Sequence, residues 1–353
     1  MPFTDLDAWL KARAAADQFS GVVLIQHGQE TVFSGAYGWA SRRWAVPNNV
    51  ATRFDTASIT KLFTSVAALR LVDEGRLELE TPITEIVDLA GTAISPAVTI
   101  GHLLTHTSGI ADDADEEAGE SHEALWVDKP VHSVVRTRDL LPQFAHKPPN
   151  FAPGDGCRYC NAGYVLVGLA IEEITGVTYR DHVRTEIFSR AGMTGSDFYD
   201  RRDAAPDVAE GWDPVVDDQG RITGWKQNIF SYPPIGSPDG GAHATVADLV
   251  RFLQALRGGE LLSAERTTQF LTPQVLHHHD RDGDVWYGFG LEFIIDRDGS
   301  VRNYYKDGGN TGACGIARHY PAGDLDVTML SNAEYGGLAV IREIDRRITA
   351  RTR

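Results

Sequence analysis

The spacing of apolar residues changes twice along this chain of 353 residues. Residues 21–38 contain two stretches rich in Val, Ile and Phe, joined at residues 27–29, and predict a pair of strands. Residues 58–75 place apolar side chains around most of a helical circumference, so a buried helix is expected there, capped by Gly75. Strand patterns return after residue 283, and a last helix is predicted from about Leu338.

The middle of the chain, residues 81–238, is poorer in strand patterns. Helices are predicted over residues 162–176 and 178–192, and a further helix opens at Thr245 with Asp248 three residues later. Strands at both ends with helices between them predict a sheet domain interrupted by a mostly helical lobe. We expect the sheet domain to comprise residues 1–80 and 239–353, and the lobe residues 81–238, with an active site in the cleft between them.

The amino-acid composition disfavours some classes of binding partner. Hydrophobic residues make up 42% of the chain, enough to bury one large core or two interleaved lobes. The formal charge of −16 repels phosphate backbones, and no apolar stretch reaches the roughly 18 residues that a membrane helix needs. These features disfavour nucleic-acid and membrane partners. Three cysteines, with no secretory pattern at the N-terminus, predict a cytoplasmic protein without a disulfide framework.

The first candidate for chemistry is the pair Ser58 and Lys61 at the start of the predicted buried helix. Their spacing puts the hydroxyl and the amine on one face of the first turn. Serine needs an adjacent base to act as a nucleophile, and lysine serves as that base only when its amine is neutral. Burial, or a second cation nearby, would lower the pKa of Lys61 toward that state. By itself the pattern is also typical of an N-cap followed by a surface lysine.

Three further motifs accompany this pair, and they are Tyr159-Cys160-Asn161, Lys306-Asp307-Gly308-Gly309 and His106-Thr107-Ser108-Gly109. Together the four motifs resemble those of the serine β-lactamase and penicillin-binding protein superfamily. The branch that they resemble is that of the class C β-lactamases, family VIII esterases and D-amino-acid peptidases. Longer blocks such as FDTASITKLFTSVAALRLVDEGRLEL and PGDGCRYCNAGYVLVGLAIEEITG extend the resemblance over nearly the whole chain.

The resemblance implies a fold and a set of catalytic residues. The fold is α+β, of the β-lactamase/transpeptidase type, with an antiparallel sheet flanked by helices plus the inserted, mostly helical lobe. Ser58 would be the nucleophile, Lys61 its base, and Tyr159 the phenol that passes a proton between nucleophile, lysine and leaving group. A phenol needs flanking cations to share or lose its proton near neutrality, and Lys61 and Lys306 are the obvious pair.

The remaining motif residues would bind substrate. By resemblance, Asn161 would hold Lys61 and a substrate carbonyl, while Lys306, on an edge strand, would lie across the cleft from Ser58. The backbone N–H groups of Ser58 and Gly309 would form an oxyanion hole, with Gly308 and Gly309 allowing close approach of the substrate. No metal and no cofactor is expected, and the substrate would be a small molecule or a short peptide.

Asp307 departs from the family pattern, which has a hydroxyl residue at this position to help bind a carboxylate. An acidic side chain there repels a carboxylate of the substrate and can also neutralise Lys306. The departure favours an uncharged ester or amide, or a substrate with a free amine, over a β-lactam or a peptide C-terminus. We therefore expect weak or no β-lactamase activity.

Three other features receive structural interpretations. The acidic segment 112–123 is interpreted as a solvated loop rather than a metal site. Cys157 and Cys160 have no second Cys or His pair nearby to hold zinc. The run His277 to His279 is interpreted as a polar surface turn, and His106 as the donor or acceptor of a structural hydrogen bond.

The leading hypothesis is a serine hydrolase that forms an acyl-enzyme at Ser58 and acts on an ester or amide, as an esterase, amidase or D-amino-acid peptidase. An acyltransferase would use the same intermediate with another acceptor in place of water. A catalytically silent binding protein on the same fold is the alternative of another class. The intact set of Ser58, Lys61, Tyr159 and Asn161 argues against that silent protein.

Overall fold

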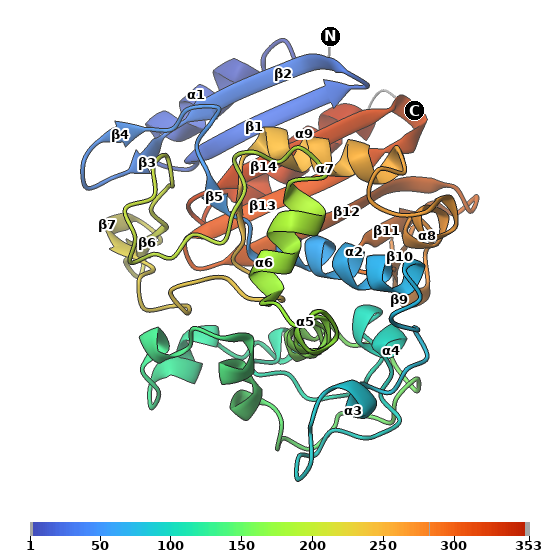
Figure 1. Cartoon of the computed structure of the whole chain (residues 1–353). Helices are drawn as coiled ribbons and strands as arrows, with labels where there is room; N and C mark the ends of the chain where they lie inside the picture. The colour runs from blue at the N-terminus through green and yellow to red at the C-terminus, as the bar shows by residue number, and fades with distance from the viewer. Residues whose placement is uncertain (1–2, 282, 350–353) are drawn as a thin grey trace.

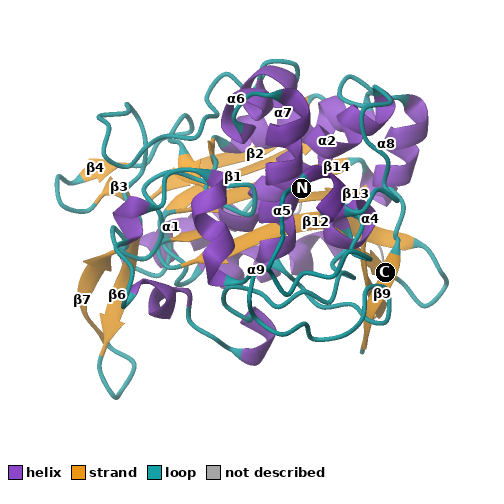
Figure 2. Ribbon diagram, turned by 60° about the horizontal axis from the view of Figure 1, so that its bottom comes forward, coloured by secondary structure: helices purple, strands orange, loops and turns teal. Residues whose placement is uncertain are grey.

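The computed structural model describes residues 3–281 and 283–349 and is built around one antiparallel sheet (Figures 1 and 2). Eight strands form it in the order β2-β1-β14-β13-β12-β11-β10-β9. They are β1 (Gly21–His27), β2 (Glu30–Tyr37), β9 (Val275–Asp280), β10 (Gly283–Tyr287), β11 (Glu292–Ile295), β12 (Val301–Asn310), β13 (Ala313–Tyr320) and β14 (Leu325–Ser331). The predicted α+β fold with an antiparallel sheet is therefore confirmed.

Each face of the sheet packs on its own set of helices. Successive side chains of a strand point to opposite faces, so in β1 Val23 and Ile25 pack with α1 (Leu6–Ala15) and α9 (Gly337–Thr349). Val22 and Leu24 face the other way, into the larger core that contains α2 (Thr60–Asp73) and α7 (Val246–Arg257). Helix α2 is buried on nearly all sides because it lies inside this core.

The chain between the two sheet segments combines helices and 3-10 turns with long loops. It contains α3 (Ile83–Ile86), α4 (Ile100–Leu104), α5 (Asn161–Thr175) and α6 (Tyr179–Val183), and α5 packs against α2, α3 and α4. The expected helix at 178–192 begins as predicted, with the Thr178 hydroxyl accepting from the Asp181 N–H, but turns into a π-helix at Arg184–Phe188. A short helix α8 (Ala264–Phe270) precedes β9.

Three small strand pairs lie outside the main sheet. They are β3 (Trp39–Ser41) with β4 (Val46–Pro47), β5 (Phe54–Asp55) with β8 (His243–Ala244), and β6 (Trp212–Val216) with β7 (Ile222–Gln227). The β6–β7 hairpin lies within residues 81–238, where the sequence pattern predicts few strands. It is only partly buried, so the apolar alternation that marks a core strand is weak there.

Two positions differ from the sequence-based expectation. His277 to His279 lie in β9, a strand at the edge of the sheet, and not in a turn. Strand β12 is not an edge strand as a whole, because it pairs with both β11 and β13. Its pairing with β11 stops at Tyr305, however, so residues 306–310 pair with β13 alone and their other edge faces the site.

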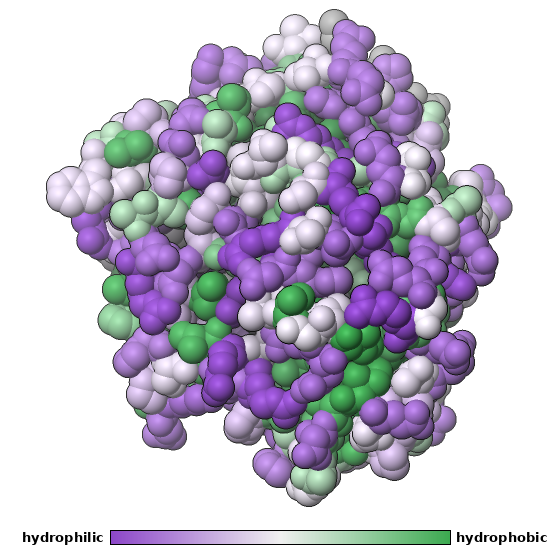
Figure 3. Space-filling model, in the orientation of Figure 1, coloured by the Kyte–Doolittle hydropathy of each residue, from purple (hydrophilic) through white to green (hydrophobic). Residues whose placement is uncertain are grey.

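The face shown in Figure 3 is mostly hydrophilic, apart from an apolar strip in the lower part of the view. Among the described helices, none is both long and apolar enough to cross a membrane.

Candidate active site

Ser58 lies in a 3-10 turn, Ala57–Ile59, that leads directly into α2. Ala57 has a φ of 44°, in the left-handed region that a residue with a Cβ adopts only under constraint. The Asp55 carboxylate supplies that constraint by accepting the Ala57 N–H at 2.8 Å, and it is itself held by Arg201 at 2.7 Å. This strained turn presents the Ser58 side chain to a pocket instead of burying it.

The Lys61 amine is completely buried and has three partners. Its Nζ lies 2.6 Å from Asn161 Oδ1, 2.6 Å from the backbone carbonyl of Asp239 and 3.1 Å from Ser58 Oγ. Asn161 Oδ1 and the Asp239 carbonyl can only accept hydrogen bonds. A neutral amine therefore donates its two N–H groups to them, and its lone pair is left to accept the Ser58 hydroxyl proton.

Charges around Lys61 act in opposite directions on its pKa. Burial is the largest effect and lowers the pKa of Lys61, and the Lys306 cation lowers it further. The carboxylates of Asp239, Glu116 and Asp112 act to raise it, but the net pKa lies below the ordinary value for lysine. The site thus favours the neutral amine that a base needs.

Tyr159 lies between the two lysines. Lys61 Nζ is 5.0 Å and Lys306 Nζ 4.9 Å from the centre of its ring, so the two lysine amines flank the phenol. Burial nevertheless raises the pKa of the Tyr159 phenol well above its usual value, and the Lys306 charge and a hydrogen bond with Ser58 only partly offset this. Tyr159 is therefore a protonated phenol in the free protein, able to pass a proton on.

Asn161 is held by two acidic residues that sequence analysis did not single out. Its Nδ2 donates to Glu116 at 2.9 Å and to Asp112 at 3.2 Å, and its backbone N–H donates to Asp112 at 2.8 Å. These bonds fix the amide with its oxygen toward Lys61. They also occupy both hydrogens of Nδ2, so the expected bond from Asn161 to a substrate carbonyl has no free donor.

The acidic segment is thus a solvated loop only in part, because residues 116–121 are exposed whereas Asp112 is buried. Asp112 is buried at the N-terminus of α5, and burial raises the pKa of its carboxyl well above the usual range. Burial also acts to raise the pKa of Glu116, but hydrogen bonds from His122 and Asn161 and the Lys61 charge outweigh it and lower that pKa to about 2. Consecutive acidic residues show no hydrophobic periodicity, so the sequence does not indicate which carboxylates face inward.

Lys306 enters the site from the far side of Tyr159. Its amine is buried and pairs with Glu292 at 2.7 Å and with Asp307 at 3.4 Å. Burial acts to lower the pKa of Lys306, but the carboxylates of Glu292 and Asp307 and the Tyr159 phenol outweigh it, so the group stays a cation. The Asp307 side chain is 55% exposed, so it neutralises Lys306 from the solvent side.

Gly308 explains how β12 comes close to the nucleophile. A Cβ at this position would collide with the Thr56 carbonyl and lie 3.0 Å from the Ser58 backbone nitrogen. Only glycine permits this approach. Gly309 and Asn310 line the same pocket as Ser58, which is where the second N–H of an oxyanion hole is expected.

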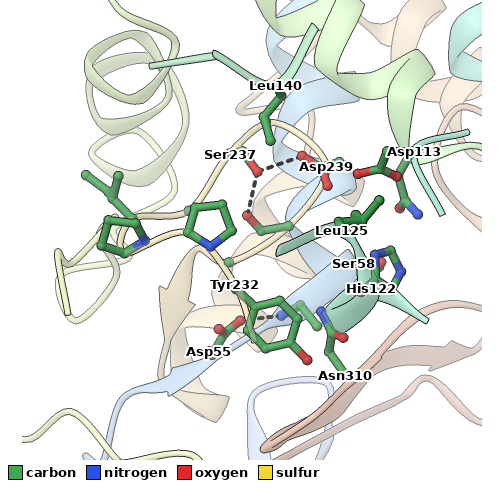
Figure 4. A pocket seen from close by; sticks show the side chains of 18 of the residues that line it. Asp55, Ser58, Asp113, His122, Leu125, Leu140, Tyr232, Ser237, Asp239 and Asn310 are labelled. Carbon is green, nitrogen blue, oxygen red and sulfur yellow. Dashed lines mark hydrogen bonds between the residues drawn. The ribbon is translucent and has the colours of Figure 1, made fainter. Parts of the chain in front are cut away.

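The pocket beside Ser58 encloses about 740 Å³, counting space open to solvent (Figure 4). Its walls combine apolar side chains (Leu125, Trp126, Leu140, Ile235) with carboxylates (Asp55, Asp113, Glu116, Asp239). Of the aromatic residues between 120 and 238, Trp126 and Tyr232 line this pocket, whereas Phe144 is core and Phe230 is exposed.

His106 has the structural hydrogen bond expected of it. Its Nδ1 accepts the Cys160 N–H at 3.1 Å, and its ring packs 4.6 Å from that of Tyr159. Burial and the two lysines lower the pKa of His106 well below its usual value, so the ring is neutral. In the described residues, no group of three or more His, Cys, Asp or Glu side chains is arranged to hold a metal.

Comparison with known proteins assigns the chain to a family. The sequence profile of the Beta-lactamase family matches residues 6–351, so the chain belongs to that family. The penicillin-binding protein of Bacillus halodurans is 36% identical, with a TM-score of 0.87, over 95% of this chain and 99% of that one. Esterase EstB of Burkholderia gladioli is 28% identical over 90% of this chain and 86% of its own length.

Two further similarities are more limited. Penicillin-binding protein 4* of Bacillus subtilis is 28% identical over 77% of this chain, which spans only 59% of that relative. The D-amino acid amidase of Ochrobactrum anthropi has a TM-score of 0.80 at 22% identity, over the whole of both chains, and shares the fold.

The close approach at Gly308 yields a first prediction. Gly308→Ala should push β12 away from the turn that carries Ser58 and slow covalent labelling of Ser58 by a fluorophosphonate about 10²-fold or more, as loss of an oxyanion donor does. The labelling rate would be followed by mass spectrometry, with circular dichroism to establish folding. Gly224→Ala, in β7 and outside the pocket, is the control, because a Cβ there meets no atom within 4 Å. Equal labelling rates in the two variants would contradict the prediction.

Proposed function

We propose that the protein is a serine hydrolase that forms an acyl-enzyme at Ser58. The observation that carries the proposal is the buried Lys61 amine, whose third partner is the Ser58 hydroxyl at 3.1 Å. Family membership and the esterase among the relatives agree with it. Of the two other classes considered, no contact favours acyl transfer over hydrolysis, and the complete set of interacting polar groups argues against a silent binding protein.

The reaction follows from the positions of the groups. Lys61 takes the Ser58 hydroxyl proton as Oγ attacks the scissile carbonyl carbon, and the N–H groups of Ser58 and Gly309 stabilise the oxyanion. Tyr159, between the two lysines, gives its proton to the leaving group and regains one from Lys61. The C–N or C–O bond breaks, leaving an ester on Ser58. Water then attacks this ester with the same groups acting in reverse, and the acid product leaves.

The substrate class that we propose is a short ester or amide without a carboxylate beside the scissile bond. Asp307 is its main determinant, because its charge adds to that of Glu292 around Lys306 and leaves little attraction for a carboxylate. The apolar walls formed by Leu125, Trp126 and Leu140 suit an acyl group of modest size.

Three variants test the catalytic roles. Ser58→Ala should abolish turnover of p-nitrophenyl butyrate, and Lys61→Ala and Tyr159→Phe should each lower kcat by about 10³-fold or more, since the residues act as one unit. Steady-state kinetics and thermal unfolding would be measured for each variant. Near-normal acylation in a folded Lys61→Ala or Tyr159→Phe protein would refute the proton relay.

The pH–rate profile provides a second test. Hydrolysis of a neutral ester should rise with pH as Lys61 loses its proton, with an apparent pKa below that of free lysine, 10.5. The negative charge of Glu116 raises the pKa of Lys61, so Glu116→Gln should move the rising limb to lower pH. The exposed Glu120 of the same loop provides the control Glu120→Gln, which should leave the limb in place. A shift to higher pH in Glu116→Gln would contradict the assignment.

Asp307 provides the third test. Asp307→Thr removes one negative charge beside Lys306 and restores a hydroxyl donor, so it should raise kcat/KM for nitrocefin about tenfold, equivalent to ~1.4 kcal/mol. Activity on p-nitrophenyl butyrate should change much less. Efficient nitrocefin turnover by the unmodified protein, or no selective gain in the variant, would show that Asp307 does not set specificity.

A further inference from the structure

His122 lines the pocket beside Ser58 and takes no part in the proposed proton transfers. It begins the 3-10 helix His122–Trp126, and Figure 4 shows it on the same side of the pocket as Asp113. Its side chain is 25% exposed, so solvent protons reach the ring. Histidine is the side chain whose charge ordinarily changes between about pH 5 and 8. A titratable group in this position can change the electrostatics of the site.

A chain of hydrogen bonds connects His122 to the base. His122 Nε2 lies 3.3 Å from Glu116 Oε1, and the same oxygen accepts a hydrogen of Asn161 Nδ2 at 2.9 Å. Asn161 Oδ1 accepts from Lys61 Nζ at 2.6 Å, and Lys61 Nζ lies 3.1 Å from Ser58 Oγ. Three side chains in direct contact with one another therefore separate His122 from the nucleophile.

Carboxylates from two segments face His122 and favour its cation. Burial acts to lower the pKa of His122, but the hydrogen bond with Glu116 and the charges of three carboxylates outweigh it and raise that pKa above the usual value. These carboxylates are Asp113 and Glu116 of the acidic segment and Asp239 of the loop before β8. His122 is therefore a cation at slightly acid pH and loses its charge above neutrality.

The other acidic side chains close to His122 in sequence have partners of their own. They are Asp115, which pairs with Arg158, Glu117, which pairs with Arg158 and His277, and Glu123, which accepts the Ser231 hydroxyl. Within residues 3–281 and 283–349, His122 is the only basic side chain that forms an ion pair with Glu116. The charge of Glu116 thus depends on His122 for its compensation.

Glu116 links the charge of His122 to that of Lys61. Burial lowers the pKa of Lys61, and four charged groups modify this effect, namely Asp239, Glu116, Lys306 and Asp112. A positive charge on His122 cancels part of the negative charge of Glu116, which favours the neutral Lys61 amine. When His122 loses its proton, Glu116 acts on Lys61 in full and the pKa of Lys61 rises.

We propose that His122 is a positioning residue that favours the neutral form of Lys61 while its own ring is protonated. The inference rests on the proposed function, since it concerns the base of that reaction. Protonated His122 holds the Glu116 carboxylate, which in turn holds the Asn161 amide with its oxygen toward Lys61. Loss of the His122 proton opposes the concurrent loss of the Lys61 proton, so activity should rise with pH less steeply than for a single titrating base.

Two substitutions separate the charge of His122 from its shape. His122→Gln keeps an N–H donor for Glu116 but is neutral, whereas His122→Lys stays positively charged. The kcat/KM for p-nitrophenyl butyrate would be measured between about pH 6 and pH 9. We expect His122→Gln to lower it about three- to tenfold at the acid end and to leave it unchanged at the basic end, where His122 itself is neutral. His122→Lys should restore the acid-end value to within about twofold of wild type.

His132→Gln is the matched control, because His132 is an exposed histidine of the neighbouring 3-10 helix Val131–Ser133, outside the pocket. It should leave kcat/KM unchanged across the range, and thermal unfolding would establish that each variant is folded. An equal loss at both ends of the range in His122→Gln, or the same loss in His122→Lys, would overturn the proposal, since either indicates lost packing instead of lost charge. So would the absence of any loss in folded His122→Gln.

Ser58→Ala separates this inference from the proposed function. Ser58-dependent hydrolysis with the same pH profile in wild type and His122→Gln would refute the role of His122 alone. If hydrolysis of the ester does not depend on Ser58, the proposed hydrolase is refuted, and this inference with it.

Discussion

The site depends on one constraint, the burial of the Lys61 amine. A lysine removed from water loses the solvation that stabilises its charge, and its three polar partners fix the direction of each hydrogen and of the lone pair. Because two of the partners can only accept, the lone pair is left for Ser58 Oγ. The same burial requires α2 to be enclosed by the core, which explains why apolar residues occupy most of its circumference.

The acidic groups around Lys61 limit how far burial lowers its pKa. Each of Asp112, Glu116 and Asp239 stabilises the lysine cation, and so opposes the neutral base that the chemistry needs. Burial outweighs them in the free protein.

The surroundings of Lys306 differ from those of Lys61. Lys306 is as buried as Lys61, yet it is paired with Glu292 at 2.7 Å and keeps its charge. Among the residues that the structure describes, Lys61 has no ion-pair partner, whereas Lys306 pairs with Glu292 and Asp307, and both lysines flank the Tyr159 ring. The lowered pKa of Lys61 and the retained charge of Lys306 make the two sides of the phenol electrostatically unequal, an arrangement that favours transfer of a proton in a defined direction.

The sequence by itself determined most strands of the main sheet, the main helices and the candidate motifs, because apolar periodicity and the spacing of Ser58 and Lys61 are local properties. Gly308 also indicates the approach of β12 to Ser58, since only glycine fits there. Which residues surround the base was decided by the tertiary structure. Asp112, Glu116 and Asp239 come from segments far apart in the chain from Lys61. The identity of an acidic residue does not indicate whether its side chain faces water or a buried amine. Their inward direction follows from long-range packing, which removes water from one side of the loop and leaves the Asn161 amide and the lysine as the available partners.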